Sequence, residues 1–126
     1  MLDFERLQFN TTEPVYLQIA QFVKQQIFMG TAAQGEALPS RRELAALLRV
    51  NPNTVQKAFR LMQEEGYLVT PPNAVSTLAW DEAVFSAIRK EMTAGLVEDF
   101  VRHAKANGLT LDLVQELLQE KWGDEK

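Results

Sequence analysis

The sequence predicts a mostly α-helical protein with one small β-hairpin, in which two short helices and the hairpin are followed by a two-helix tail. Three observations carry this prediction. Capped helical segments lie within 38–66, β-prone runs flank a proline-rich turn within 67–79, and apolar residues recur at helical spacing from residue 81 onward. The 126 residues suit one domain, or a small domain with an appendage.

The first helix of the pair is predicted to begin at Ser40. Leu38-Pro39 approaches it in an extended conformation, because a residue before proline is disfavoured in the helical region. Ser40 supplies an N-cap, and Glu43, three residues later, completes a capping box. The apolar stripe of this helix is expected to consist of Leu44, Leu47 and Leu48.

The second helix of the pair is predicted to run from about Pro52 to Glu65. Asn51 is a good N-cap, Pro52 is tolerated in a first turn, and Gly66 is a typical C-terminal stop. Its inner face is expected to comprise Val55, Ala58, Phe59 and Met62. The residues that point elsewhere can all hydrogen-bond: Asn53, Thr54, Gln56, Lys57 and Arg60.

Amides and cations on the outer face of a second short helix are typical of a recognition helix for the DNA major groove. A solvated face in an ordinary helical hairpin would show a similar pattern, since polar helix faces are usual. The residues of this face alone leave both interpretations open.

The N-terminal part is expected to support this pair. Residues 1–13 predict an extended arm that lays its aromatic side chains on a neighbouring surface. Thr12 is a plausible N-cap for a helix over 14–29, which Gly30 ends. The apolar stripe of that helix is expected to be Tyr16, Ile19, Ala20, Val23 and Ile27. Residues 31–37 are predicted to form a connector.

Strands are predicted over 67–70 and 75–79, joined by the turn Pro71-Pro72-Asn73. Neither the turn nor Ala74 carries a charge. A neutral, stiff tip cannot neutralise phosphate or hold an arginine in a minor groove. Any contact of this tip with DNA is therefore expected to be weak.

The tail is predicted to form a helix from Asp81 to about Asn107, then a second helix, capped by Thr110, from Leu111 to about Trp122. Two helices joined by a short turn cannot fully bury both apolar stripes against each other, whereas a second copy could cover them. Folding of the tail back onto its own N-terminal domain is the alternative. The expected dimer-interface residues are Val84, Ile88, Met92, Leu96, Phe100, Leu113, Leu117 and Trp122.

Net charge is −4, which is unusual for a DNA-binding protein, but the charge is unevenly distributed. Residues 1–80 hold 7 Lys+Arg and 7 Asp+Glu, a net of zero, and residues 81–126 hold 6 and 10, a net of −4. Local charge governs phosphate contact, so the acidic total does not exclude DNA binding. There is no cysteine and no apolar run of about 18 residues, so we expect a cytoplasmic protein without a membrane span.

The sequence offers no candidate for catalysis. No glycine-rich phosphate loop is present, and His103 is the single histidine, without a metal-ligand pattern around it. Asp99 lies one helical turn from His103, a spacing that is common by chance. Trp80 and Trp122 are expected to serve as core or dimer anchors rather than as an aromatic cage. We therefore expect neither an enzyme, nor a metal site, nor a cofactor.

Three runs of the chain, PVYLQIAQFVKQQI, LPSRRELAALL and VNPNTVQKAFRLMQEEGYL, resemble the N-terminal winged helix-turn-helix of GntR-family transcription factors. The VNPNTVQKA run with a short tail is most similar to the small YtrA-type branch. The resemblance implies a winged helix-turn-helix domain over 1–79 and a dimerisation tail over 80–126. This sequence departs from the family pattern at the wing tip, Pro71 to Ala74. In the family the wing tip usually carries glycines and Arg or Lys.

The resemblance implies a homodimeric regulator of transcription that binds double-stranded DNA, with Arg42 at a position that contacts DNA in the family. Repression by operator occupancy is the expected mechanism, with the helix start at Ser40 anchoring phosphate. The candidate DNA-binding residues are Ser40, Arg41, Arg42, Asn51, Asn53, Thr54, Gln56, Lys57 and Arg60.

Two questions stay open at this point. A winged-helix module that binds a partner protein through its apolar tail is the alternative function, favoured by the acidic total and the uncharged tip. A small-molecule effector is also undecided. The tail is too short to enclose a pocket of about 300–1,000 Å³ by itself, so an effector would bind at a junction or at the dimer interface.

Overall fold

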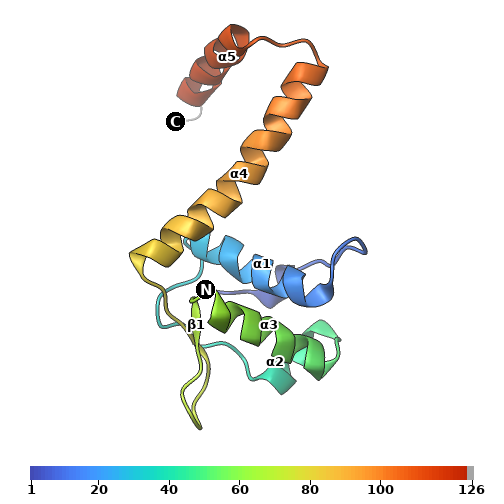
Figure 1. Cartoon of the computed structure of the whole chain (residues 1–126), viewed down its shortest axis with the longest axis vertical. Coiled ribbons are helices and arrows are strands. Elements are labelled where there is room, and N and C mark those ends of the chain that lie inside the picture. The colour runs from blue at the N-terminus through green and yellow to red at the C-terminus, as the bar shows by residue number, and fades with distance from the viewer. Residues whose placement is uncertain (125–126) are drawn as a thin grey trace. The chain divides into compact units, whose positions relative to one another are not determined.

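The computed structural model describes residues 1–124 and divides into two compact units, the first spanning Met1–Arg89 and the second beginning at Lys90. The elements are mostly helical, with one two-stranded antiparallel hairpin (Figure 1), which confirms the predicted fold class. None of the helices in the described residues is long and apolar enough to cross a membrane.

Helix α1 (Val15–Met29) ends as predicted but begins differently. Gly30, at φ 80°, adopts the left-handed conformation that glycine tolerates best and stops the helix. Thr12 is not its N-cap, because the Thr12 hydroxyl and backbone N–H both donate to Asn10 Oδ1. Buried Gln18 instead ties down the chain before α1: its Nε2 donates to the carbonyls of Asn10 and Glu13, and its Oε1 accepts from Asn10 N–H.

Helices α2 (Arg41–Leu48) and α3 (Pro52–Glu64) form the predicted helix-turn-helix. Arg49, at φ 58°, makes the left-handed turn between them, and Val50 N–H donates to the Ala45 carbonyl. The prediction for the apolar stripe of α2 was wrong at Leu47, which is 47% exposed, whereas Ala45 is buried. Leu44 and Ala45 therefore face the core, and Leu47 faces the surface.

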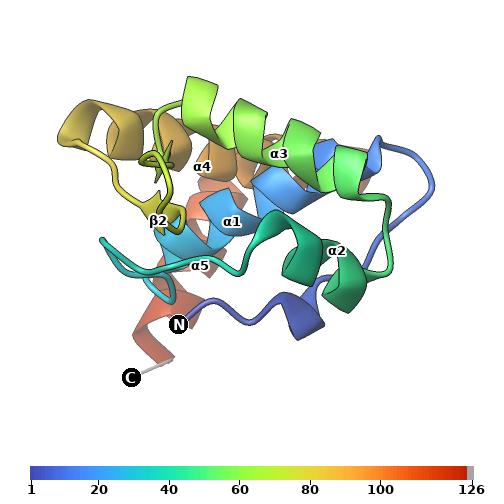
Figure 2. The same ribbon diagram turned by 90° about the horizontal axis from the view of Figure 1, so that it is seen from below.

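The core of the first unit lies where α1 packs on α3 and α2 packs on α3, an arrangement that Figure 2 shows from below. The predicted inner face of α3 is buried in full. Every residue of the predicted α1 stripe is also buried except Tyr16, which is half-buried. The largest fully buried side chains are Ile19, Val23, Ile27, Leu44, Val55, Phe59, Met62, Tyr67 and Leu78.

Tyr67, at the end of the helix-turn-helix, connects α3 to α1. It is fully buried, and its hydroxyl donates to the Ala20 carbonyl at 3.1 Å. The buried Lys24 lies 5.8 Å from the Tyr67 ring centroid and forms an ion pair with Glu65. The aliphatic stem of Lys24 is thus enclosed while its charge meets a partner, which is the usual condition for burying a lysine.

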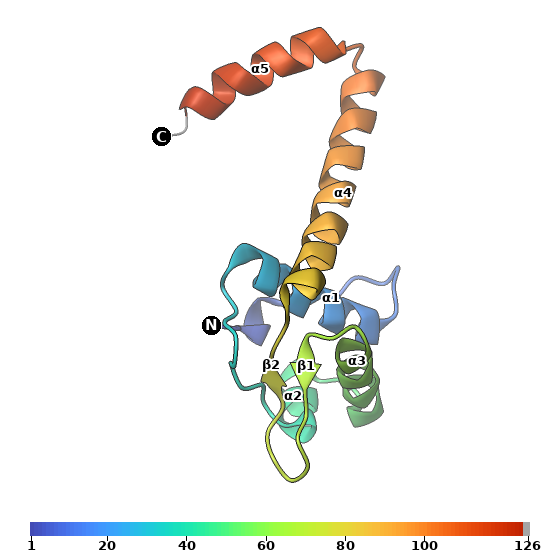
Figure 3. The same ribbon diagram turned by 60° about the vertical axis from the view of Figure 1, so that its left-hand side comes forward.

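The hairpin, or wing, is shorter than the sequence predicts. Strands β1 (Leu68–Val69) and β2 (Thr77–Leu78) lie side by side (Figure 3). They pair antiparallel, with Leu68 opposite Leu78. The approach to α2 adds a third extended segment, because Ala37 bridges to Thr77 and Leu38 N–H donates to the Ser76 carbonyl. The predicted turn is present, with Asn73 at φ 57°.

The N-terminal arm lays an aromatic residue on the domain, as predicted. A 3₁₀ turn, η1 (Phe4–Arg6), contacts α2, and Phe4 is 4% exposed. The Phe4 and Phe22 rings lie 5.6 Å apart between centroids, within the range of favourable aromatic pairs. The arm is therefore part of the core packing.

Helix α4 (Glu82–Ala106) is preceded by Asp81, whose Oδ1 accepts from Val84 N–H at 2.8 Å and caps the first turn. Its first turns pack on the first unit. Ile88 is 3% exposed, and a Cβ added to Gly66 would lie 3.1 Å from Val84 Cγ2. These contacts explain why the first compact unit reaches Arg89, whereas the sequence pattern places the boundary after residue 79.

In the second unit, Gly108 at φ 77° ends α4, and Thr110 Oγ1 accepts from Leu113 N–H at the start of α5 (Leu111–Asp124). Large apolar side chains of this unit stay exposed in the single chain. They are Leu96, Val97, Phe100, Val101, Leu111, Leu113, Leu117, Leu118 and Trp122.

Candidate nucleic-acid interface

The outer face of α3 is the main polar surface of the helix-turn-helix. Asn53, Lys57 and Arg60 are exposed, and Thr54 and Gln56 are partly exposed. They lie away from the buried face because α3 repeats every 3.6 residues, which turns each of them out of the apolar stripe. The face presents amide, hydroxyl and cationic groups, which are the groups that contact base edges and phosphates.

Asn51 stands at the entrance to this face but has a structural task. Its Oδ1 accepts from Asn53 N–H at 2.7 Å, so Asn51 is the N-cap of α3 as predicted. The cap fixes the direction in which the first turn of α3 leaves the preceding loop. Asn51 is a candidate DNA-binding residue, but its side-chain oxygen already accepts a hydrogen bond from the backbone.

The start of α2 is closed by the predicted capping box. Ser40 Oγ accepts from Glu43 N–H at 3.1 Å, and Glu43 Oε1 accepts from Ser40 N–H at 3.0 Å. The hydrogen bond from the Ser40 backbone, and then that with the Ser40 side chain, lowers the pKa of Glu43 below its ordinary 4.5. This reciprocal pair holds the N-terminus of α2 in place.

The two arginines that follow Ser40 have different environments. Arg42 is exposed. Arg41 is half-buried, with its guanidinium carbon 5.2 Å from the Phe59 ring centroid, and its buried Nε has no hydrogen-bond partner in the described part of the chain. Arg42 is thus the freer cation, while Arg41 packs on the buried face of α3.

A cleft of about 590 Å³ separates the start of α2 from the wing. Arg41, Ser40 and Phe59 line one side, and residues 70–76 line the other. At the base of the wing, the Thr70 and Ser76 hydroxyls are 2.7 Å apart. The tip beyond them, Pro71 to Ala74, is exposed and carries no charged side chain.

Lys57 contacts Tyr16, which the sequence pattern placed on the apolar stripe of α1. The Lys57 ammonium lies 4.8 Å from the centroid of the Tyr16 ring. Periodicity predicts the burial of a helix face but not which side chain of another helix reaches its edge. The contact between α1 and α3 therefore could not be found from the local pattern.

Outside this surface, His103 is exposed, and its neighbour Asp99 pairs with Arg102 at 3.1 Å. The described residues contain no group of three or more His, Cys, Asp or Glu side chains that could hold a metal ion. The expected dimer-interface residues divide between the units. Val84 and Ile88 pack in the first unit, whereas Met92, Leu96, Phe100 and the three residues of α5 belong to the second.

Known proteins match this chain over the helix-turn-helix and over much of the tail. The model for bacterial regulatory proteins of the gntR family matches residues 15–74. The HTH-type transcriptional regulator YhcF of Bacillus subtilis is 32% identical over 103 residues, covering 82% of this chain and 85% of that protein. The chain belongs to the GntR family. It is therefore a DNA-binding transcriptional regulator and not an enzyme.

Other relatives extend the likeness over almost the whole chain. The HTH-type transcriptional repressor YtrA of Bacillus subtilis is 31% identical over 125 residues, covering 93% of this chain and 91% of that protein. This match agrees with the resemblance to the small YtrA-type branch. YhcF and YtrA are both described as HTH-type regulators of transcription.

Solved structures give the same fold. A GntR family transcriptional regulator from Listeria monocytogenes superposes with a TM-score of 0.73 at 27% identity, over 89% of this chain and 98% of that one. A transcriptional regulator from Oenococcus oeni has a TM-score of 0.75 at 22% identity, over 94% and 99% of the two chains. The winged helix-turn-helix followed by tail helices is thus shared along the full length of these proteins.

Proposed function

We propose that this GntR-family regulator is a homodimeric repressor that acts in the cytoplasm by occupying its operator. The exposed amide and cationic face of α3 is the observation that carries the proposal. In the proposed complex, α3 enters the major groove of double-stranded DNA, and its N-terminal residues Asn53, Thr54 and Gln56 read base edges. Repression is supported by the relative YtrA, which is named a repressor.

Phosphate contacts would hold α3 in register. The capped N-terminus of α2 at Ser40 and the exposed guanidinium of Arg42 form one anchor, because helix N-termini attract anions. Lys57 and Arg60, exposed on α3, supply the second. The uncharged wing tip offers no cation to the backbone, so this proposal assigns the wing no phosphate contact.

The proposed dimer forms through the second unit. Its exposed apolar side chains are more than soluble monomers usually leave uncovered in one place, and a two-fold partner would cover the same residues on both copies. Ile88 is not part of the proposed interface, because it is already buried within its own chain. The interface would consist of Met92, Leu96, Phe100, Leu113, Leu117 and Trp122.

The proposal is tested by selecting bound sequences from a random duplex pool and then titrating the selected duplex at rising salt. We expect a site with two-fold symmetry and half-sites about 34 Å apart, bound with an affinity that falls steeply with salt. A selected site without symmetry would contradict the dimer. Failure to bind any duplex at low salt would favour the alternative, a protein-binding module that uses the apolar tail.

A repressor that works by occupancy needs no contact with polymerase. Placed over a promoter, the selected site should lower transcription in a purified system in proportion to its occupancy by the protein. The same site placed well upstream should have no effect. Activation from either position would contradict repression by occupancy.

A further inference from the structure

A cleft at the start of α4 in the first unit has no role in the proposed DNA binding. Its volume is about 750 Å³, within the range of small-molecule sites. Gln34 from the connector after α1 lines one side, and residues of the segment from Trp80 to Arg89 line the rest. All of these residues belong to the first compact unit.

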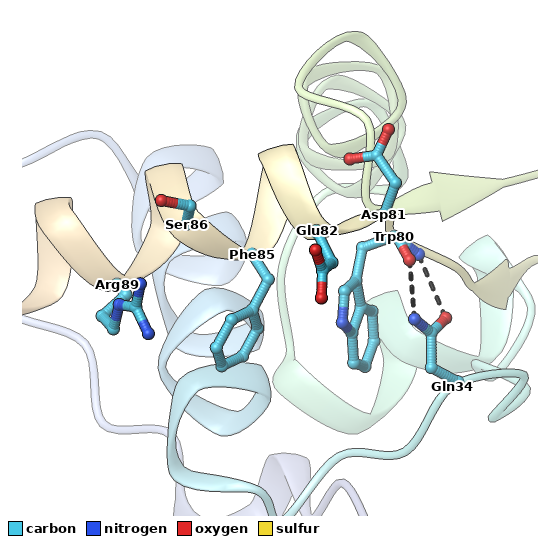
Figure 4. Close-up of a pocket in the computed structure, with 7 residues that line it drawn as sticks. All are labelled: Gln34, Trp80, Asp81, Glu82, Phe85, Ser86 and Arg89. Atoms are coloured by element: carbon cyan, nitrogen blue, oxygen red, sulfur yellow. Dashed lines mark hydrogen bonds between the residues drawn. The ribbon is translucent and has the colours of Figure 1, made fainter.

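Two aromatic side chains form walls of this cleft. Figure 4 shows Trp80 and Phe85 on the same side of α4, with the carboxylate of Glu82 drawn between the two rings in this view. Both aromatic residues are half-buried, so parts of their surfaces stay open. Trp80 is thus neither a core residue of the chain nor part of the second unit.

The Trp80 wall is held in place by its backbone. Gln34 Nε2 donates to the Trp80 carbonyl at 2.6 Å, and Trp80 N–H donates to Gln34 Oε1 at 3.1 Å. This two-bond clamp fixes the connector against the start of α4. A wall that is already ordered costs less conformational entropy when a ligand packs on it.

The charges of the cleft favour a positively charged ligand near the rings. Asp81 Oδ1 caps α4, whereas the Glu82 carboxylate is exposed and forms no hydrogen bond or ion pair within the described part of the chain. Arg89 already interacts with another group of the chain. It lies about two turns further along the helix, roughly 10 Å from Glu82 along the axis. A carboxylate and two aromatic rings that line one cleft are the groups that recognise organic ammonium ions.

We propose that the cleft formed by Gln34, Trp80, Glu82 and Phe85 binds a small organic cation, with its ammonium group against the two rings and Glu82 as counter-ion. Arg89, at the far end of the cleft, disfavours cations with a second positive charge there. A ligand in the cleft packs on the first two turns of α4, the helix that continues into the second unit. The role of the cation as an effector rests on the proposed DNA-binding function. The binding of the cation to the cleft does not rest on that function.

The test uses the full chain without DNA and three probes that share a benzyl group. Benzyltrimethylammonium carries a positive charge, benzyl alcohol is neutral and phenylacetate is negative. By titration calorimetry we expect the cation to bind with a dissociation constant on the order of 1 mM or tighter, at least about tenfold tighter than the other two. Equal or tighter binding of phenylacetate, or no binding of the cation at millimolar concentration, would overturn the proposal.

Two variants then locate the site. Glu82→Gln should weaken the cation about tenfold and leave benzyl alcohol unchanged, and Phe85→Leu, which keeps an apolar side chain but removes a ring face, should weaken the cation similarly. Glu98→Gln removes one carboxylate from an exposed position further along α4 and is the matched control. Unchanged cation binding in Glu82→Gln would overturn the assignment.

Tryptophan fluorescence reports on the cleft directly, because the chain has two tryptophans and Trp122→Phe leaves Trp80 as the sole emitter. Emission of that variant should change with the cation at the concentrations found by calorimetry. Emission that stays constant through saturation would place the cation elsewhere and overturn the proposal. A chain that failed to bind duplex DNA could still give every expected result here, so the two proposals fail separately.

Discussion

The ammonium of Lys57 on α3 lies 4.8 Å from the centroid of the Tyr16 ring on α1. An exposed cation on a long flexible side chain normally loses conformational entropy when it reaches a phosphate. The Tyr16 ring restricts the Lys57 side chain in the free protein. Lys57 therefore loses less conformational entropy when it binds a phosphate. In the proposed complex with DNA, helix α1 would therefore support Lys57 on α3 through Tyr16.

We therefore expect Tyr16→Leu to weaken operator binding about two- to fivefold, since an exposed cation–π contact is worth about 0.5–1 kcal/mol. Tyr16→Phe keeps the ring and should bind as the wild type does. Fluorescence anisotropy with a labelled duplex measures both. Equal affinities for Tyr16→Leu and Tyr16→Phe would mean that the contact does not prepare Lys57 for DNA.

Base reading and phosphate contact should separate between the two helices of the helix-turn-helix. Gln56→Ala should relax sequence preference more than it weakens binding to random DNA, because an amide reads base edges. Arg42→Ala should weaken all duplexes alike and lower the slope of log affinity against log salt by about one. Comparing operator and random duplexes at several salt concentrations checks both, and unchanged binding of Arg42→Ala to every duplex would contradict the docking.

The capping box of α2 should make stability depend on pH in the acid range. The Ser40 hydrogen bonds lower the pKa of Glu43 in the folded chain, so its contribution is fully present above the ordinary value of 4.5 and is lost as pH falls below it. Glu43→Gln keeps the shape of the cap but cannot titrate. Thermal melts from about pH 7 to about pH 3 should therefore show a smaller acid destabilisation for Glu43→Gln than for the wild type.

Glu64→Gln removes one exposed carboxylate from the end of α3 and controls for the change in net charge. Identical pH profiles for the wild type and Glu43→Gln would show that the box does not couple to protonation.

The ion pair between Lys24 and Glu65 should respond differently to the loss of each partner. Glu65→Gln leaves the charge of a lysine that is 5% exposed without its carboxylate, and we expect a loss of about 1–3 kcal/mol in the free energy of unfolding. Lys24→Met removes the buried charge and keeps much of the stem, so it should be close to neutral. Urea denaturation of both variants measures the difference, and equal losses would show that the charge itself stabilises α1.

Features set by neighbouring residues could be predicted from the sequence. The Ser40–Glu43 box, the Asn51 cap and the turn at Asn73 each depend on a few consecutive residues, and all three are present. Thr12 does not cap α1, because its hydroxyl and N–H donate to Asn10 Oδ1 while the buried Gln18 binds the carbonyls of the chain before α1. Local pattern could not show that competition.

Features set by contacts distant in sequence could not be predicted. Leu47 and Ile88 each lie on an apolar stripe, but which one is buried depends on how closely a neighbouring element approaches. The position of the Arg41 guanidinium on Phe59 is of the same kind. For the candidate DNA-binding surface, the residue types were thus predictable, whereas the restraint on Arg41 and Lys57 was not.

The last prediction concerns the proposed dimer, and Leu96 is its sharpest probe. Leu96 is 68% exposed in the chain, so replacing it should not disturb the folding of the single chain. Within the proposed interface, Leu96→Asp would bury an unpaired charge on both copies, at a cost of about 3 kcal/mol or more. The dimer dissociation constant should then rise at least about a hundredfold, and operator binding should fall because the second half-site contact is lost.

Lys105→Gln is the matched control, since it also lowers net charge by one but lies about 180° around α4 from Leu96 at 100° per residue. Sedimentation velocity at tens of micromolar should show a dimer for the wild type and Lys105→Gln and a monomer for Leu96→Asp. Circular dichroism should show helix content close to that of the wild type for all three proteins, because Leu96 and Lys105 are both exposed. A monomeric wild type, or Leu96→Asp that still sediments as a dimer, would remove the second unit from the interface and require each winged domain to find its half-site alone.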